Sequence, residues 1–248
     1  MSFNKRKHLG SQPGFNSGIF GKSSSGPPFV PSDYFLNFWA TNDQLISGTT
    51  TTIYDQVGVL DMANIDVTSQ PTYSDPYQDF DGVTDYLRNT VSNFRTSDTT
   101  GVVTLKVKLT DNTTKQNYLF CSADELTAKY IYVSYRNLKL RITFIGLTGG
   151  THIVESNDAL TFNQEYKISW YNTGSAIKLM VDGVVVGVNN VSGSYSGQWF
   201  NLLDTFSDNI SLGAAVSLSV LYGKSSIEKA GYSAYTNEAA ITTLQSLL

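Results

Sequence analysis

The sequence predicts an all-β protein: an antiparallel two-sheet jelly-roll sandwich with an extended N-terminal arm and a short C-terminal helix. Two observations carry this prediction. Apolar and polar residues alternate along several short segments, and such alternation is typical of strands that are buried on one face. Glycine, asparagine, aspartate and serine separate these segments. Short strands repeating every 8–12 residues or so between such turns favour an antiparallel sandwich.

Three segments, 102–110, 138–144 and 165–172, show the alternation most clearly. The residues expected to face the core are Val103, Leu105, Val107, Leu109, Leu138, Leu140, Ile142, Phe144, Tyr166, Ile168 and Trp170. The opposite face is expected to carry Thr104, Lys106, Lys108, Lys139, Arg141, Lys167, Ser169 and Tyr171. Because successive strand residues point to opposite faces, this pattern places a core on one side of each strand.

One hairpin and one helix can be placed with their end signals. Asp182-Gly183 lies between two β-branched runs, and this dipeptide favours a type I′ turn with positive φ at both residues. At the C-terminus, Thr236 or Asn237 is expected to cap a helix. Its apolar stripe at helical spacing comprises Ala240, Ile241, Leu244, Leu247 and Leu248.

The chain divides into an arm, residues 1–33, and a jelly-roll domain, residues 34–248. Residues 1–32 contain 5 Gly, 7 Ser and 4 Pro, a composition that cannot bury enough surface to fold alone. They carry a formal charge of +4, whereas the remainder carries −8. A basic arm on an acidic body is typical of an interaction tail.

Spaced apolar side chains distinguish the arm from a plain flexible linker or an expression remnant. The residues expected to anchor it are Phe3, Lys5, Arg6, Lys7, Phe15, Ile19, Phe20 and Phe29. We expect them to dock on other subunits of an oligomeric assembly. No apolar segment follows the basic residues, so a Sec signal peptide is not expected. No run approaches the roughly 20 apolar residues of a membrane span.

The residues of common catalytic sites are sparse. Of the two histidines, His8 lies in the arm and His152 in a predicted strand, which leaves Cys121 without an evident base. Cys121 is expected to be buried. The glutamates are far apart in sequence, unlike the alternating carboxylates of retaining glucanases. The acidic body disfavours nucleic acid. These observations predict a protein that is not an enzyme; a glycoside hydrolase or lyase is the alternative that they disfavour.

A lectin-like site is the remaining candidate. The loops of 193–209 supply Tyr195, Trp199, Asp204 and Asp208 as possible glycan-binding residues. Such a loop can be ordered by Ca²⁺ through carboxylate and carbonyl oxygens, but no residue set identifies a metal site here. In the alternative, Trp199 and Phe200 cover the open end of the sandwich, and the aspartates only form turns.

The segment 80–88, FDGVTDYLR, has two aspartates that resemble an acid pair. We interpret it as structural. Phe80, Val83, Tyr86 and Leu87 are expected to pack, and Asp81-Gly82 to form a turn. Asp85 is expected to accept hydrogen bonds from local backbone N–H groups.

Six motifs in order resemble the laminin-G-like, concanavalin A-like jelly roll often found in phage structural proteins. They are Trp39, the D-x-x-G loop 55–58, the Q-P-x-Y segment 70–73, the segment 80–87, the Asp182-Gly183 hairpin and the ending 231–247. The resemblance covers about 34–248 and excludes the arm. It implies two sheets with six or seven strands each. Family members bind glycans, bind proteins or decorate a surface. The family's calcium ligands are loop aspartates, and no position here matches them.

Two functions follow as expectations. The first is a virion structural protein without catalytic activity: a capsid decoration, head-fibre or tail-associated protein, made in the host cytoplasm. Its arm would bind capsid or tail subunits. The alternative is a carbohydrate- or receptor-binding, lectin-like module for attachment to host surface glycans.

Overall fold

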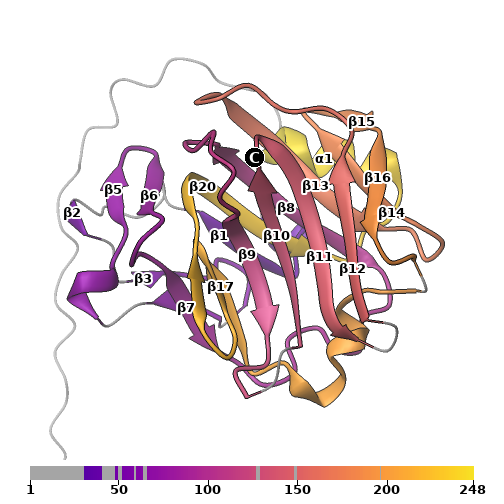
Figure 1. Cartoon of the computed structure of the whole chain (residues 1–248), viewed down its shortest axis with the longest axis horizontal. Coiled ribbons are helices and arrows are strands. Elements are labelled where there is room, and N and C mark those ends of the chain that lie inside the picture. Colours follow the sequence, from indigo (N-terminus) through magenta and orange to yellow (C-terminus); the bar gives the residue numbers. More distant parts are fainter. Residues whose placement is uncertain are drawn as a thin grey trace, which may run out of the picture.

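A computed structural model describes residues 31–40, 48–49, 52–58, 60–63, 66–126, 129–147, 150–195 and 197–248. The described chain is mostly β-strand in antiparallel sheets, with one C-terminal α-helix, and the two large sheets stack as a sandwich (Figure 1). The predicted fold class is therefore confirmed. The expected anchoring residues of the arm, from Phe3 to Phe29, lie outside the described residues.

The first sheet has its strands in the order β15, β14, β13, β8, β20, β6, β5, β2, and β1 also pairs with β20. Their bounds are β15 Val184–Val186, β14 Ile177–Val181, β13 Glu165–Asn172, β8 Gly101–Lys108, β20 Lys224–Ser233, β6 Tyr77–Asp81, β5 Thr72–Ser74, β2 Gly48–Thr49 and β1 Asn37–Ala40.

The second sheet has the order β16, β12, β11, β10, β9, β17, β7, β4, β3. Their bounds are β16 Val188–Ser192, β12 Gly150–Ser156, β11 Lys139–Leu147, β10 Tyr130–Arg136, β9 Asn117–Ala123, β17 Asn209–Leu212, β7 Leu87–Thr90, β4 Met62–Ala63 and β3 Thr52–Ile53. A separate hairpin pairs β18 (Ala214–Val216) with β19 (Val220–Tyr222). Each large sheet has nine strands within the described residues, more than the expected six or seven, because short strands from β1 to β5 extend them.

The main core fills the space between the two sheets and confirms the predicted inward faces. On β8, Val103, Leu105 and Val107 are buried in it, and on β13 so are Ile168 and Trp170. The predicted hairpin forms between β14 and β15, with φ of 48° at Asp182 and 80° at Gly183. Cys121 is buried, as expected.

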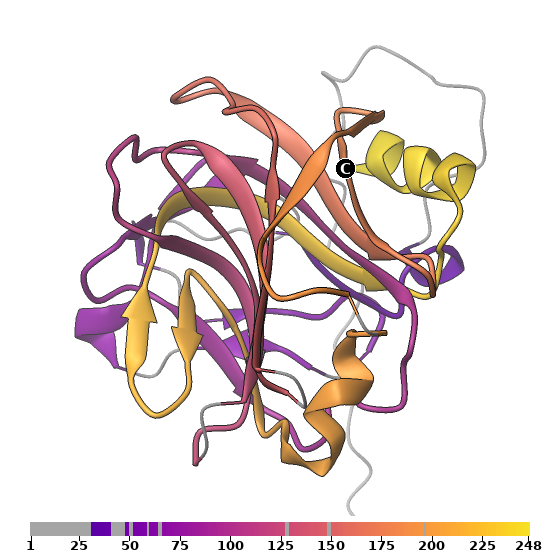
Figure 2. The same cartoon turned by 45° about the vertical axis from the view of Figure 1, so that its right-hand side comes forward.

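The helix α1, Glu238–Leu247, lies on the outer side of the first sheet (Figure 2). Asn237 caps it, since its side chain accepts a hydrogen bond from the N–H of Ala240 at 2.8 Å. Ile241 and Leu244 pack on this side with Tyr171. The sequence placed Tyr171 on a polar face; that expectation is corrected, because α1 turns this part of the outer face into a second, smaller core.

The D-x-x-G motif has a physical basis in the structure. The buried carboxylate of Asp55 accepts hydrogen bonds from the Asn37 side chain at 2.6 Å and from the N–H of Phe38 at 3.0 Å. A Cβ on Gly58 would lie 2.6 Å from Asp55 Oδ2. The loop therefore needs an acceptor at its first position and no side chain at its last.

The β6–β7 turn is likewise structural. Asp81 accepts from the N–H groups of Val83 and Thr84 at 2.7 and 2.9 Å, and Gly82 has φ of 75°. Asp85 accepts from the N–H of Asp81 at 3.1 Å, as expected. One detail was wrong: Val83 does not pack, because its side chain is 66% exposed at the tip of the turn.

Candidate functional site

The predicted aromatic platform in 193–209 is corrected by the structure. Trp199 is 0% exposed, and its Nε1 donates to the hydroxyl of Tyr232 at 3.1 Å inside the sandwich. Its ring packs 5.3 Å from that of Phe200. A sugar cannot stack on an indole that is already covered on all sides. Trp199 and Phe200 instead close the interior, which is the alternative considered from the sequence.

The other three predicted residues do not converge on one surface. Tyr195 is half-buried, and its hydroxyl donates to Asn172 Oδ1 at 2.9 Å. Asp208 accepts from the N–H of Glu125 at 3.0 Å. Asp204 lies in the 3-10 helix Phe200–Phe206, and its side chain falls outside the described part of the structure. Among the described residues, no group of three or more His, Cys, Asp or Glu side chains is placed to hold a metal ion.

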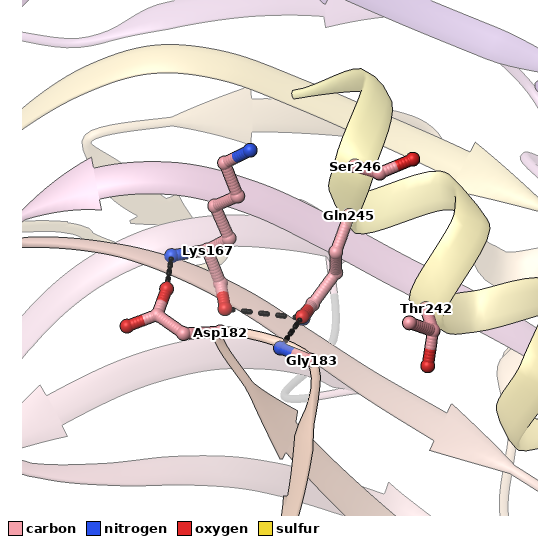
Figure 3. A pocket seen from close by; sticks show the side chains of 6 residues that line it. All are labelled: Lys167, Asp182, Gly183, Thr242, Gln245 and Ser246. Atoms are coloured by element: carbon pink, nitrogen blue, oxygen red, sulfur yellow. Dashed lines mark hydrogen bonds between the residues drawn. The ribbon is translucent and has the colours of Figure 1, made fainter.

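A cavity of about 340 Å³ lies between α1 and the β14–β15 hairpin (Figure 3). Gln245 crosses it and is almost fully buried. Its Oε1 accepts from the N–H of Gly183 at 2.6 Å, and its Nε2 donates to Lys167 O, Ser169 Oγ and Met180 O at 3.0, 2.9 and 3.1 Å. Since these polar groups already satisfy one another, the cavity marks how α1 is attached to the first sheet rather than a ligand site.

A second hollow, also of about 340 Å³, lies beside the β6–β7 turn and is lined by Asp81, Asp85 and Lys224 among others. Burial raises the pKa of Asp85. Burial also opposes the charge of Asp81, but hydrogen bonds from the N–H groups of Thr84, Val83 and Asp85 lower its pKa overall. The pKa values of the two carboxyls thus shift in opposite directions. Both carboxyls already accept hydrogen bonds from the backbone of the turn.

Two glutamates that are distant in sequence meet on the outer face of the first sheet. Lys106 Nζ lies 2.6 Å from Glu228 Oε2 and 3.6 Å from Glu165 Oε1. Glutamates that are far apart in the sequence are therefore close in the fold, which corrects the expectation drawn from their spacing. Glu165 also accepts a hydrogen bond from the hydroxyl of Tyr77. Burial, together with this bond and the nearby negative charge, raises the pKa of Tyr77, so the phenol stays protonated at neutral pH.

The least covered face of the sandwich is the outer face of the second sheet, which Figure 1 shows from the front. Tyr118 of β9 and Tyr130 and Tyr132 of β10 cluster there with Ile145 of β11, and we call these four residues the tyrosine face. They alternate with Ile131 and Val133, which point into the main core. The rings of Tyr130 and Tyr132 stack at 5.4 Å, and those of Tyr118 and Tyr132 meet edge-on at 5.0 Å.

Tyr118 and Tyr130 are half-buried, so part of each ring faces solvent, whereas Tyr132 is buried between them. The β18–β19 hairpin packs against β9 and supports one side through Ala215. Burial raises the pKa of Tyr118, Tyr130 and Tyr132, which keeps all three hydroxyls protonated and able to donate.

Polar and charged groups border the tyrosine face. Gln116 Nε2 donates to Ser134 Oγ at 2.9 Å on the β9–β10 side. Arg141 forms an ion pair with Glu155 across β11 and β12, and Arg88 forms one with Glu125 at the opposite border. Because these charges are paired, the face combines apolar rings and hydroxyls with little net charge.

The sequence contains a signal for this surface. Tyr130 and Tyr132 are two residues apart in a strand-like run, which puts both rings on one face. Tyr118 lies in the same strand as Cys121. What the sequence could not show is that β9 and β10 are neighbours, which brings Tyr118 beside the other two.

No protein-family model and no curated protein match this sequence. Solved structures do match. The CBM40 module of a Ruminococcus gnavus IT-sialidase, bound to α2,3-sialyllactose, has a TM-score of 0.50 and 13% identity, covering 59% of this chain and 82% of that one. A Trypanosoma rangeli sialidase in complex with 2,3-difluorosialic acid has a TM-score of 0.62 and 13% identity. The match covers 87% of this chain and 33% of the sialidase chain. A mutant of the NanB sialidase from Streptococcus pneumoniae has a TM-score of 0.51 and 13% identity. The match covers 67% of this chain and 27% of the sialidase chain.

The prediction that the protein is not an enzyme is corrected by these matches. Sialidases share its fold over most of its length, although the match spans only about a third or less of their own chains. The structure also brings Glu165 and Glu228 together at Lys106, so the separation of the glutamates in the sequence does not exclude catalysis.

The matches confirm only part of the resemblance to the jelly rolls of phage structural proteins. They show a jelly-roll β-sandwich, and nothing in them shows a phage origin. In the described part of the chain, no helix has the length and apolar character needed to cross a membrane. At this level of identity the likeness extends to the fold, which this chain shares with a carbohydrate-binding module and with sialidases.

Proposed function

We propose that the protein is a lectin-like module that binds carbohydrate through the tyrosine face. The observation that carries the proposal is the solvent-facing rings of Tyr118 and Tyr130 on the open side of the sandwich. A tyrosine ring offers a flat apolar surface for the C–H groups of a sugar and a hydroxyl for its oxygens. A protein of the same fold binds sialyllactose.

The contrast between the two sheets supports this location. On the outer face of the first sheet, α1 and the side chains of Phe35 and Phe38 cover one part. The ion pairs of Lys106 with Glu165 and Glu228 occupy another. The second sheet has a smaller cover, the β18–β19 hairpin, and leaves two aromatic rings accessible. Since the neighbouring charges are paired, we expect this face to contact neutral parts of a glycan.

The test is a glycan array with the full chain, followed by titration calorimetry on the best ligand. Replacing Tyr130 by alanine is expected to weaken binding about tenfold, the usual effect of truncating a central aromatic contact. The variant should stay folded under the conditions of the assay, since the ring is only half-buried and lies outside the main core.

Tyr235→Ala is the matched control, because this tyrosine is 37% exposed and precedes α1, away from the second sheet. Its affinity should equal that of the wild type. The proposal fails if the wild type binds no glycan at millimolar concentration. It also fails if Tyr130→Ala and Tyr235→Ala bind equally well.

A second candidate function rests on the charge asymmetry of the sequence, +4 in residues 1–32 against −8 in the remainder. In it, the arm attaches the domain to other subunits of a virion, and the domain projects from the particle. Deleting residues 1–32 should leave a folded domain with unchanged thermal stability and abolish its incorporation into particles. Full incorporation of the truncated chain, measured by quantitative electrophoresis of purified particles, would contradict it.

A further inference from the structure

We propose a second ligand site, separate from the tyrosine face, in which Arg95 binds the carboxylate of an acidic sugar such as a uronic acid. The site is a hollow of about 260 Å³ that is lined by Leu60, Val91, Ser92, Asn93, Phe94, Arg95 and Ser97. Most of these residues belong to the loop between β7 and β8. A hollow of this size is at the small end of ligand pockets and suits one sugar ring.

The guanidinium of Arg95 is held rigidly. Its Nη2 donates to Asn37 Oδ1 at 2.7 Å and to Leu36 O at 3.2 Å. Its carbon lies 5.4 Å from the ring centre of Tyr232 and 5.9 Å from that of Phe94. A planar cation fixed between aromatic rings and neutral acceptors loses little freedom when it binds a ligand.

The charge of Arg95 is not neutralised by a direct partner. No carboxylate oxygen of the described residues lies within 4.0 Å of its nitrogens. Two acids contact the residues that surround the guanidinium and do not contact the guanidinium itself. Asp55 bonds the far side of the Asn37 amide at 2.6 Å, and Asp98 accepts from the hydroxyl of Tyr232 at 2.9 Å. Both are engaged there, and three of the five guanidinium N–H groups keep no acceptor among the described residues.

The loop backbone is strained where it presents this group. Arg95 has φ of 55° and Asn93 has φ of 61°, left-handed values that residues other than glycine seldom adopt. The strain is held by hydrogen bonds from Val91 N to Asp208 O and from Asn93 N to Ser207 O. Such strain persists only where the surroundings enforce it, and it often serves a ligand site.

The remaining lining matches a sugar better than a simple anion. Leu60 and Val91 are partly exposed and form an apolar wall against which ring C–H groups can pack, and the buried ring of Phe94 lies behind them. Ser92, Asn93 and Ser97 supply hydroxyl and amide groups for sugar oxygens. The body carries −8 overall, so long-range attraction does not recruit an anion, and affinity must come from these short-range contacts.

The experiment is ligand-observed NMR and calorimetry on the full chain with D-glucuronate, D-glucose and glutarate. We expect D-glucuronate to bind at least tenfold more tightly than D-glucose or glutarate, and Arg95→Gln to lose about tenfold or more of that affinity. Arg136→Gln is the matched control, since Arg136 is exposed at the end of β10. Tyr130→Ala should bind D-glucuronate like the wild type.

Arg95 also braces Leu36 and Asn37, so a second variant guards against misfolding. Ser92 is exposed, and Ser92→Phe should fill the hollow and abolish binding while the guanidinium remains in place. The proposal is overturned if the wild type does not bind D-glucuronate, or if both variants bind it normally. Equal affinity for glutarate would overturn the assignment to a sugar. Loss of D-glucuronate binding in Tyr130→Ala would place the ligand on the tyrosine face instead.

Discussion

Gly223→Ala is expected to lower the free energy of unfolding by about 3 kcal/mol, a large part of the total stability of a domain. Gly223 joins β19 to β20, and at this point the chain packs closely against β9. A Cβ there would lie 2.1 Å from the backbone nitrogen of Tyr118 and 2.3 Å from its carbonyl oxygen. Because backbone atoms of a central strand cannot swing away, the sheet has to shift, and Tyr118 shifts with it.

Chemical denaturation of the purified variant checks this, with glycan binding as a second readout. Gly187→Ala is the matched control. Its Cβ would lie 2.4 Å from Asn157 Nδ2, but that atom ends an exposed, flexible side chain that can move. We expect a change of about 1 kcal/mol or less for the control. Equal stability of the two variants would contradict the close approach at Tyr118.

Gln245→Leu is expected to lower the free energy of unfolding by about 3 kcal/mol and to release α1 from the first sheet. The substitution puts an apolar side chain of similar size in place of the amide and leaves the partly buried N–H of Gly183 without its acceptor. It also removes the donor to Met180 O and Lys167 O. Each buried polar group left without a partner costs about 1–3 kcal/mol. Hydrogen exchange should show loss of protection in α1 and in the β14–β15 hairpin.

Two variants separate the hydrogen bonds from the size of the side chain. Gln245→Glu keeps an acceptor for Gly183 but cannot donate while ionised, so it should be nearly as destabilising as the leucine variant. Ser246→Ala changes an exposed residue lining the same cavity and should stay within about 0.5 kcal/mol of the wild type. Wild-type protection of α1 in Gln245→Leu would show that apolar packing of Ile241 and Leu244 suffices.

The parts of the fold that could be predicted are those with local signals. Alternation placed Val103 and Trp170 in the core, Asp182-Gly183 formed its turn, and Asn237 capped α1. The outer faces could not be read in the same way. Alternation shows which residues share a face, but not whether a distant segment such as α1 will cover that face.

The candidate site was missed for the same reason. A loop carrying Trp199 suggested an exposed platform, but the fold turns that indole inward to donate to Tyr232. The tyrosine face depends on β9 and β10 lying side by side, and the Arg95 hollow depends on contacts with Asn37, which is 58 residues away in the chain. Contacts between distant segments decide both sites, and a single sequence carries little information about them.

The most direct test of carbohydrate binding is a titration of the ¹⁵N-labelled protein with lactose and with α2,3-sialyllactose, followed by backbone amide shifts. We expect saturable shifts at Tyr118, Tyr130, Tyr132 and Ile145, and none around the buried Trp199. Tyr130→Ala should need about ten times more ligand to reach the same shifts, and Tyr235→Ala should match the wild type. Shifts confined to the loop 193–199, or no shifts for any ligand that the array identifies, would contradict carbohydrate binding at the tyrosine face.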